Sequence, residues 1–446
     1  MSLQERWSSG FYFILAATGA AVGLGSIWKF PYEAGLNGGG LFVACYLIFI
    51  LLVGIPALVA EMSIGVIGRR NPVEVFAYFH QTSGSSRGWQ FLGYLSLVTL
   101  ILIFSFYSVI AGWDLDYLVW SFTESMAGLS SSQIQSHWQS LQSSFPRMLF
   151  YHSLFSILTG LVVIFPIKKG LERATKMLMP LLFLLVIILV LMTLSMSGLH
   201  DAIAYLFNFS WDHLSAKMIL EALGNACFTL AIGAGCMLVY GAYLPQGTKM
   251  ISVAFWVALL NAFVALMSGL AIFTIVFTYQ LDPRGGPGLM FETLPLCFSQ
   301  HPGGDFFAIG FFALLFLAAW TSAISLIEPL VTYLMQSFHL SRLHAATLAT
   351  FVGWVLGLGT IVSFNIEKNL GLFGFSNFFE MVSYLTTNVF LNIGIIAYTL
   401  FTGWCLKRQS LQTALNTHSG IFSVWYLQIK YILPLIFVVI LIRTMV

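Results

Sequence analysis

Two pairs of glycines interrupt apolar segments in opposite halves of this chain of 446 residues. Gly23 and Gly25 lie in the first apolar segment, and Gly233 and Gly235 lie in the sixth. Glycine weakens a helix, and backbone freed from helical hydrogen bonds at membrane depth is tolerated only where it lines a cavity. Interrupted segments in corresponding positions of two halves are typical of a central binding site in a membrane transporter.

The composition supports an all-α integral membrane protein in a lipid bilayer. Of its residues 59% are hydrophobic and 8% are charged, far from the balance of a soluble domain. Apolar runs of about twenty residues, long enough to cross a bilayer, recur along the chain. They predict eleven spans near residues 10–35, 41–68, 88–123, 148–166, 172–198, 217–243, 249–281, 304–337, 341–363, 377–406 and 423–443. The links between them, such as 125–146, are polar.

The distribution of lysine and arginine predicts the orientation. With the N-terminus inside, the cytoplasmic links collect Arg6, Arg69, Arg70, Arg87, Lys168, Lys169, Arg173, Lys176, Lys249, Arg342, Lys407 and Arg408. The outer links collect only Arg147, Lys217, Arg284, Lys368 and Arg443. This asymmetry predicts a cytoplasmic N-terminus, and an odd number of spans places the C-terminus outside. We expect a multi-pass protein of the plasma membrane, most simply the bacterial inner membrane.

The residues resemble the signature of one transporter family. Residues 20–32 read Ala-Ala-Val-Gly-Leu-Gly-Ser-Ile-Trp-Lys-Phe-Pro-Tyr, and residues 37–40 read Asn-Gly-Gly-Gly. With Glu61, Tyr107 and Trp113 further on, they resemble the neurotransmitter:sodium symporters, which have the LeuT-type fold. The resemblance covers essentially the whole chain. It implies a single domain over 1–446, in which two inverted five-helix repeats have broken first and sixth helices.

The resemblance also divides the chain and places two sodium sites. The repeats would cover 10–198 and 217–406, with an additional helix at 423–443. It implies a second sodium site made by carbonyls of Gly19, Val22 and Ala318 and hydroxyls of Thr321 and Ser322. Unwound carbonyls and hydroxyls are hard oxygen ligands that hold sodium without a buried net charge.

The first sodium site departs from the family pattern. The resemblance implies ligands from Ala21, Thr229 and Asn261, together with an amide side chain where this chain has Ser26. The serine oxygen reaches less far than that of asparagine, so one or two sodium ions are expected. Tyr46, Asn225 and Thr229 would line a remnant anion pocket, but Ala265 supplies neither charge nor hydroxyl. Chloride coupling is therefore not expected.

The substrate expected from this resemblance is a neutral amino acid. Gly23 stands where amine-transporting relatives have aspartate, so the substrate would bring its own carboxylate to the amides of Leu24 and Gly25 and the Tyr107 hydroxyl. Its ammonium group would meet carbonyls of Ala21, Phe228 and Thr229. The side-chain pocket would be formed by Ile103, Tyr107, Phe228, Ala231, Ala234, Ser322 and Leu326. Two alanines in this set predict a roomy apolar pocket for a large hydrophobic or aromatic side chain.

The gates depart from the family pattern as well. Phe228 and Tyr107 would form an aromatic lid, and Lys29 would pair with Glu380, because Ser383 replaces the family's aspartate. On the inner side the family's ion pair becomes Gln4 and Gln336, which predicts an uncharged latch. Trp7 and Tyr243 are still available beside that latch.

These expectations favour a sodium-coupled amino-acid symporter that works by alternating access, and not an enzyme. No nucleophile–base set or metal cluster emerges, and no nucleic-acid partner is expected. A membrane sensor that binds substrate without accumulating it is one alternative. Proton-coupled transport is another, because Glu61 lies within the second span; in the resembling fold this carboxylate instead binds freed backbone amides. The sequence does not indicate an oligomeric state.

Overall fold

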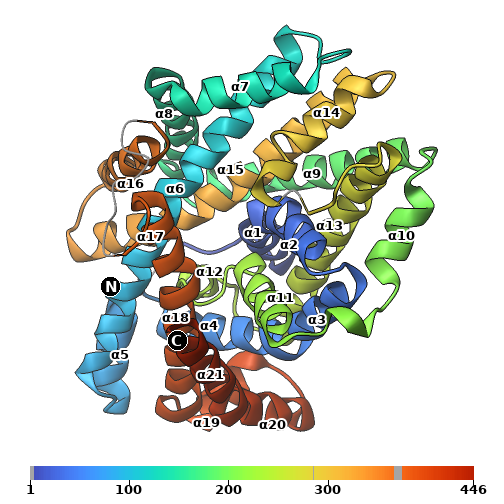
Figure 1. Cartoon of the computed structure of the whole chain (residues 1–446). Coiled ribbons are helices and arrows are strands. Elements are labelled where there is room, and N and C mark those ends of the chain that lie inside the picture. The colour runs from blue at the N-terminus through green and yellow to red at the C-terminus, as the bar shows by residue number, and fades with distance from the viewer. Residues whose placement is uncertain (1–4, 285, 366–373, 446) are drawn as a thin grey trace.

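The computed structural model describes residues 5–284, 286–365 and 374–445, and every regular element within them is a helix (Figure 1). Apolar runs with little polar alternation form helices because a lipid-exposed backbone must satisfy its hydrogen bonds within one segment.

The first half contains five spans and three shorter helices. The broken first span is α1 (Gly10–Ala21), η1 (Gly25–Lys29) and α2 (Phe30–Leu36). The second span is α3 (Gly40–Phe49), η2 (Ile50–Gly54) and α4 (Ile55–Gly68). The remaining elements are α5 (Glu74–Ser83), η3 (Arg87–Trp89), α6 (Gln90–Thr123), α7 (Ser131–Ser143), α8 (Phe145–Val163), α9 (Leu171–Thr193) and α10 (Leu199–Phe207).

The second half begins with another broken segment, formed by α11 (Ala216–Thr229) and α12 (Cys236–Ala242) after the short η4 (Trp211–His213). The following elements are α13 (Met250–Thr278), η5 (Gly286–Leu289), α14 (Thr293–Gln300), α15 (Gly304–Ser337) and α16 (Arg342–Phe364). The last are α17 (Phe378–Tyr384), η6 (Leu385–Phe390), α18 (Leu391–Leu400), η7 (Phe401–Cys405), α19 (Arg408–Leu415), α20 (Ser419–Leu427), η8 (Gln428–Ile432) and α21 (Leu433–Met445).

The predicted spans agree with these helices to within a few residues at most ends. In the part of the chain that the structure describes, nine helices are long and apolar enough to cross a membrane, and the bent pair of the first span makes a tenth. The two helices of the sixth segment, of 14 and 7 residues, are each too short to pass alone. The polar link 125–146 is more ordered than expected, because α7 occupies it and begins with a capping box at Ser130.

The two longest helices, α6 and α15, pack against each other in the interior. In α6, 83% of the most apolar stretch is buried, against 33% in α9, which identifies α9 as peripheral. The α1–α2 segment lies between these long helices and α13 in Figure 1. The broken first span is therefore enclosed by continuous helices, and its freed backbone groups face protein.

Candidate functional site

The first membrane span breaks where α1 meets η1. Helix α1 ends at Ala21, Val22 has extended backbone with φ −78° and ψ 96°, and the two parts of the span bend by 55°. A Cβ atom at Gly23 would lie 2.6 Å from the Tyr107 hydroxyl oxygen and closer still to Ser322 Oγ. Glycine therefore lets the break approach α6 and α15 closely, and it frees the last carbonyls of α1.

The sixth segment breaks over residues 230–235. Ala231, Gly233 and Gly235 all have positive φ, at 53°, 89° and 81°. Glycine adopts this region readily, whereas alanine is strained there. The predicted glycine pair thus marks the break, and Ala231 is held in the same conformation by its surroundings.

Glu61 on α4 satisfies the amides that this second break leaves free. Its carboxylate is fully buried and accepts hydrogen bonds from the backbone N–H groups of Gly233 (2.7 Å), Met237 (3.0 Å) and Leu238 (3.3 Å). This arrangement confirms the expectation that Glu61 binds amides of a broken helix. By accepting these three bonds the carboxylate supplies the acceptors that the interrupted helix lacks and so stabilises the break.

The five positions predicted for the second sodium site lie together where α1 meets α15. Ser322 Oγ is 3.0 Å from the carbonyl oxygen of Gly19 and 3.3 Å from that of Val22. Thr321 Oγ1 is 3.1 Å from the Ala318 carbonyl oxygen, and a Cβ at Gly19 would lie 3.3 Å from the Thr321 Cβ. Three carbonyls and two hydroxyls, all buried and uncharged, are a donor set that fits a small hard cation.

The side chains predicted for the first sodium site also lie together, but they already bond to one another. Ser26 Oγ donates to Asn261 Oδ1 over 2.6 Å. Asn261 Nδ2 donates to the Tyr46 hydroxyl (3.3 Å), which is 3.1 Å from Thr229 Oγ1. Ala21 is buried at the end of α1. A cation here would have to draw the Ser26 and Asn261 oxygens away from their mutual hydrogen bond.

The expected remnant anion pocket contains a buried amide. Asn225 lies one turn before Thr229 on α11, is 1% exposed, and its side-chain nitrogen and oxygen have no partner among the described residues. Ala265 is fully buried and adds no polar atom. A buried amide of this kind calls for a water or ion, because unpartnered polar groups are costly in an interior.

A small cavity of about 50 Å³ lies between the two breaks. Nine residues predicted to bind substrate line it: Ala21, Gly25, Ile103, Tyr107, Phe228, Ala231, Ala234, Ser322 and Leu326. Of the other two, Leu24 lines a larger neighbouring cavity, and Thr229 is bonded toward Tyr46. The other four lining residues, Ala20, Gly23, Cys236 and Leu391, were not among those predicted to bind substrate.

This cavity is smaller than the sequence predicted. Its volume suits a few water molecules and not an aromatic side chain in the present conformation. The Leu24 amide, which we expected to bind a substrate carboxylate, donates instead to the Tyr107 hydroxyl over 3.1 Å. The prediction of a roomy pocket from two alanines is therefore not met here, and the bulky side chains of Phe228 and Leu391 are among those that line the cavity.

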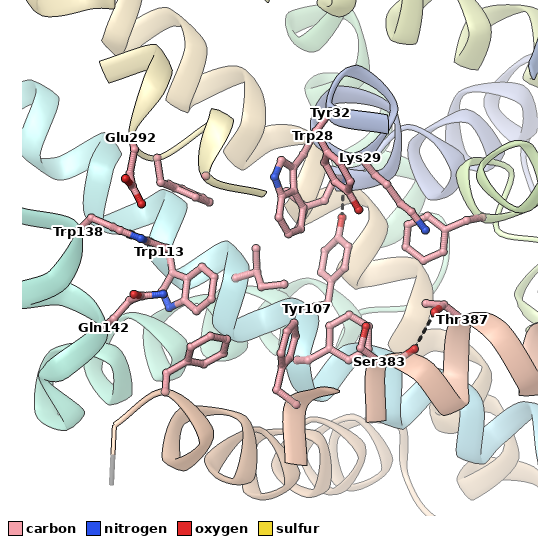
Figure 2. Close-up of a pocket in the computed structure, with 18 residues that line it drawn as sticks. Trp28, Lys29, Tyr32, Tyr107, Trp113, Trp138, Gln142, Glu292, Ser383 and Thr387 are labelled. Atoms are coloured by element: carbon pink, nitrogen blue, oxygen red, sulfur yellow. Dashed lines mark hydrogen bonds between the residues drawn. The ribbon is translucent and has the colours of Figure 1, made fainter. Parts of the chain in front are cut away.

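A vestibule of about 490 Å³ lies outside the small cavity, and Tyr107 and Phe228 line both. Figure 2 shows Trp28 and Tyr32 on one side of this vestibule and Trp113 and Trp138 on the other. The two shared aromatic residues thus occupy the position expected of a lid.

The outer ion pair predicted between Lys29 and Glu380 is absent from this conformation. Lys29 Nζ lies 4.7 Å from the centroid of the Phe228 ring, and the Glu380 carboxylate accepts the backbone N–H of Ser376 (2.9 Å). Ser383 lines the vestibule (Figure 2). The prediction failed because Glu380 lies in the first turn of α17, where its own loop offers amide donors.

Before the first span, Trp7 connects the N-terminal segment to the end of α12. Its backbone N–H donates to the Tyr243 carbonyl (3.1 Å), and its indole N–H donates to that of Tyr240 (3.3 Å). The Tyr243 hydroxyl donates to Glu328 Oε1 (3.0 Å), and Glu328 forms a buried ion pair with Arg342 (2.6 Å). The sequence interpretation did not find this ion pair, since 14 residues and the α15–α16 loop separate its partners.

The neutral inner latch is tested only in part. Gln336 Oε1 accepts hydrogen bonds from the backbone N–H and the side-chain N–H of Asn71, both over 2.9 Å. Gln4 lies outside the described residues, so its pairing with Gln336 stays a prediction.

Comparison with known proteins gives a consistent result. A profile of the sodium:neurotransmitter symporter family matches residues 4–146 and 148–446. An uncharacterised sodium-dependent transporter of Bacillus subtilis, YhdH, is 34% identical over 439 residues, covering 98% of this chain and 96% of that protein. A similarly named transporter of Haemophilus influenzae is 30% identical over 450 residues, covering 99% and 98%. The crystal structure of MhsT in complex with L-phenylalanine superposes with a TM-score of 0.91 at 35% identity, covering 99% of this chain and 100% of MhsT.

Proposed function

Because this chain belongs to the sodium:neurotransmitter symporter family, we propose that it is a symporter that uses sodium to take up a neutral amino acid with a large hydrophobic or aromatic side chain. Its relatives are named sodium-dependent transporters, and the fold is that of MhsT, a LeuT-type fold with broken helices and an eleventh span. Uptake would proceed by alternating access, since the outer vestibule and the inner contacts of Trp7 lie on opposite sides of one small cavity.

The observation that carries this proposal is the double role of Ser322. Its side chain lines the small cavity, and its hydroxyl contacts the carbonyls of Gly19 and Val22 in the predicted second sodium site. An ion that orders these oxygens would also order one wall of the cavity. Occupancy of the two sites is then coupled through one residue, which is what sodium-driven uptake requires.

The chemistry of the cavity supports an amino acid. Gly23 supplies no carboxylate, so an amine substrate would bring an uncompensated charge, whereas an amino acid brings its own carboxylate. That carboxylate would displace the Tyr107 hydroxyl from the Leu24 amide and accept from both, with the Gly25 amide beside them. The ammonium group would meet carbonyls of Ala21, Phe228 and Thr229.

A bulky substrate requires the cavity to widen. Phe228 is the side chain positioned to do this, because it lines both the cavity and the vestibule. Phenylalanine in the complex of MhsT shows that a relative with 35% identity and the same fold accommodates an aromatic side chain. Ala231 and Ala234 would then face the substrate side chain.

Ion use and topology complete the proposal. One sodium ion would occupy the second site, and a second ion would occupy the first site only when Ser26 and Asn261 separate. We expect no chloride requirement. The N-terminus would be cytoplasmic and the C-terminus external, in a bacterial inner membrane. Lys29 would act in the outer gate through Phe228, and Gln4 and Gln336 would form the inner latch.

The first test is binding of each of the twenty amino acids to purified protein in sodium and in potassium. The proposal predicts that large hydrophobic or aromatic amino acids bind in sodium and lose most affinity in potassium. Hits are then assayed for uptake into proteoliposomes. Sodium-dependent binding without accumulation would point to a sensor, and uptake driven by a pH gradient without sodium would point to proton coupling. Binding that does not depend on sodium would overturn the ion sites.

A further inference from the structure

A third cavity lies far from the substrate site, on the side of the molecule that carries Trp7. It has a volume of about 700 Å³ and lies between the end of α4, the loop of residues 243–249 and the helix α19. Helix α19 packs against α4, and the Asn416 side chain after it donates to the Gly247 carbonyl (3.0 Å). The walls are thus three segments that contact one another, and the cavity is a built feature of the fold.

The charge of this cavity is positive. Arg69 and Lys407 are its ionisable lining residues, and no carboxylate is among the residues that line it. Neither cation forms an ion pair with a residue in the described part of the chain. Burial, together with the nearby Arg6, lowers the pKa of Arg69. Cations left without counterions in one concavity attract anions to it.

Arg69 is held in place before any ligand arrives. Its Nη1 and Nη2 atoms donate to the carbonyls of Ala242 (3.1 Å) and Leu244 (3.0 Å) at the end of α12. A guanidinium has five N–H donors, so these two bonds leave three for another acceptor. A fixed guanidinium loses little side-chain entropy on binding, and its planar fork suits phosphate oxygens.

The rest of the lining matches an oxygen-rich anion with an apolar portion. Amide and hydroxyl donors come from Gln409 and Ser410, whereas Val66 and Ile67 form an apolar wall. We propose that this cavity binds a phosphate-bearing anion, held by Arg69 and Lys407. The anion is the headgroup of an acidic phospholipid or a soluble phosphate compound, since both present the same oxygens. This site does not depend on the proposed substrate.

The experiment measures thermal stability of the purified protein in neutral detergent and potassium buffer, without amino acid. The protein is titrated with short-chain phosphatidylglycerol, with phosphatidylcholine of equal chain length, and with inorganic phosphate at constant ionic strength. We expect a saturable rise in Tm with phosphatidylglycerol or phosphate, but not with phosphatidylcholine. An effect of phosphatidylglycerol alone identifies a lipid headgroup, and an effect of inorganic phosphate identifies a soluble compound.

Three variants distinguish a specific binding site from general electrostatic attraction. Lys407→Gln removes a cation that makes no hydrogen bond to a described residue, so the fold should be kept, and we expect the apparent affinity to fall about tenfold. Lys169→Gln removes an exposed cation outside the cavity and should leave the affinity unchanged. Arg69→Lys keeps the charge but loses the fork and should weaken binding too. An equal loss in Lys407→Gln and Lys169→Gln, or no saturable rise with any anion, would overturn the proposal.

Discussion

The two predicted ion sites are built in different ways although they lie beside the same break. The second site takes two carbonyl oxygens from the break, at Gly19 and Val22, and the Ala318 carbonyl and two hydroxyls from the continuous helix α15. The first site relies on the side chains of Ser26, Thr229 and Asn261, which hydrogen-bond to one another or to Tyr46. At the second site the Thr321 and Ser322 hydroxyls donate to carbonyls of the same site over 3.0 to 3.3 Å, whereas at the first site the Ser26 hydroxyl donates to Asn261 over 2.6 Å.

This difference has an energetic consequence. At the second site a cation replaces the longer bonds that the Ser322 hydroxyl donates to the carbonyls of Gly19 (3.0 Å) and Val22 (3.3 Å), which lack helical donors at the break. At the first site a cation replaces the 2.6 Å bond between Ser26 and Asn261, so the gain is smaller. We therefore expect sodium binding to depend more on α1 and α15 than on Ser26 and Asn261.

The largest effect is expected from Gly23→Ala. The new Cβ would lie 2.6 Å from the Tyr107 hydroxyl oxygen and closer to Ser322 Oγ. The side chains of Tyr107 and Ser322 would therefore both have to move. We expect amino-acid binding in sodium to weaken by at least about a hundredfold. Gly25→Ala is the matched control, because its Cβ would meet the Phe228 ring at 3.0 Å, and a ring can swing away. Equal losses in the two variants would contradict this comparison.

A hundredfold loss or somewhat less is expected for sodium affinity in Thr321→Val. Valine keeps the shape of threonine but removes the hydroxyl ligand. We expect the loss of this one buried ligand to lower the sodium affinity by up to about a hundredfold. The measurement is the sodium concentration that gives half-maximal amino-acid binding. Thr350→Val on α16 removes another buried hydroxyl, one without a partner among the described residues, and should not change this concentration.

A smaller effect, about tenfold, is expected for Asn261→Ala in the same sodium titration. This variant removes the acceptor of the Ser26 hydroxyl and one predicted ligand, but leaves the backbone oxygens of the second site in place. If Asn261→Ala costs as much as Thr321→Val, the first site carries an equal share of sodium binding, and the contrast drawn between the sites is wrong.

The smallest effect is a gain. Ser26→Asn restores the longer amide side chain that the family pattern has at the first site, and we expect the half-maximal sodium concentration to fall about threefold. Ser26→Ala should raise it by a similar factor. A loss in Ser26→Asn would show that Asn261 and the surrounding side chains leave no room for the longer ligand.

The sequence predicted the spans and breaks well because their causes are local. Apolar length determines a span, and glycines such as Gly233 and Gly235 adopt the positive φ that a break requires. Helix α7 was missed because its residues are polar and its stability comes from capping and packing. Glu328 and Arg342 were missed as a pair because their contact depends on how α15 and α16 meet.

In the candidate site, too, some features could be predicted from the sequence and others depend on how distant helices pack. The resemblance to the symporter family implied most residues that line the small cavity, so nine were predicted. Its volume was not, because Leu391 enters from a distant segment and its place depends on the packing of α18. The partner of Lys29 was also mispredicted, since charge alone does not tell whether a lysine lies over Phe228 or beside Glu380.

The most direct test of the central claim is accumulation of labelled L-phenylalanine in proteoliposomes, with an inward sodium gradient or an equal potassium gradient, for wild type and Thr321→Val. The account predicts accumulation above the outside concentration in wild type with sodium only, and its loss in Thr321→Val. Other large hydrophobic amino acids should compete. Equal uptake with sodium and potassium, or undiminished accumulation in Thr321→Val, would contradict the claim that the second site couples sodium to the substrate.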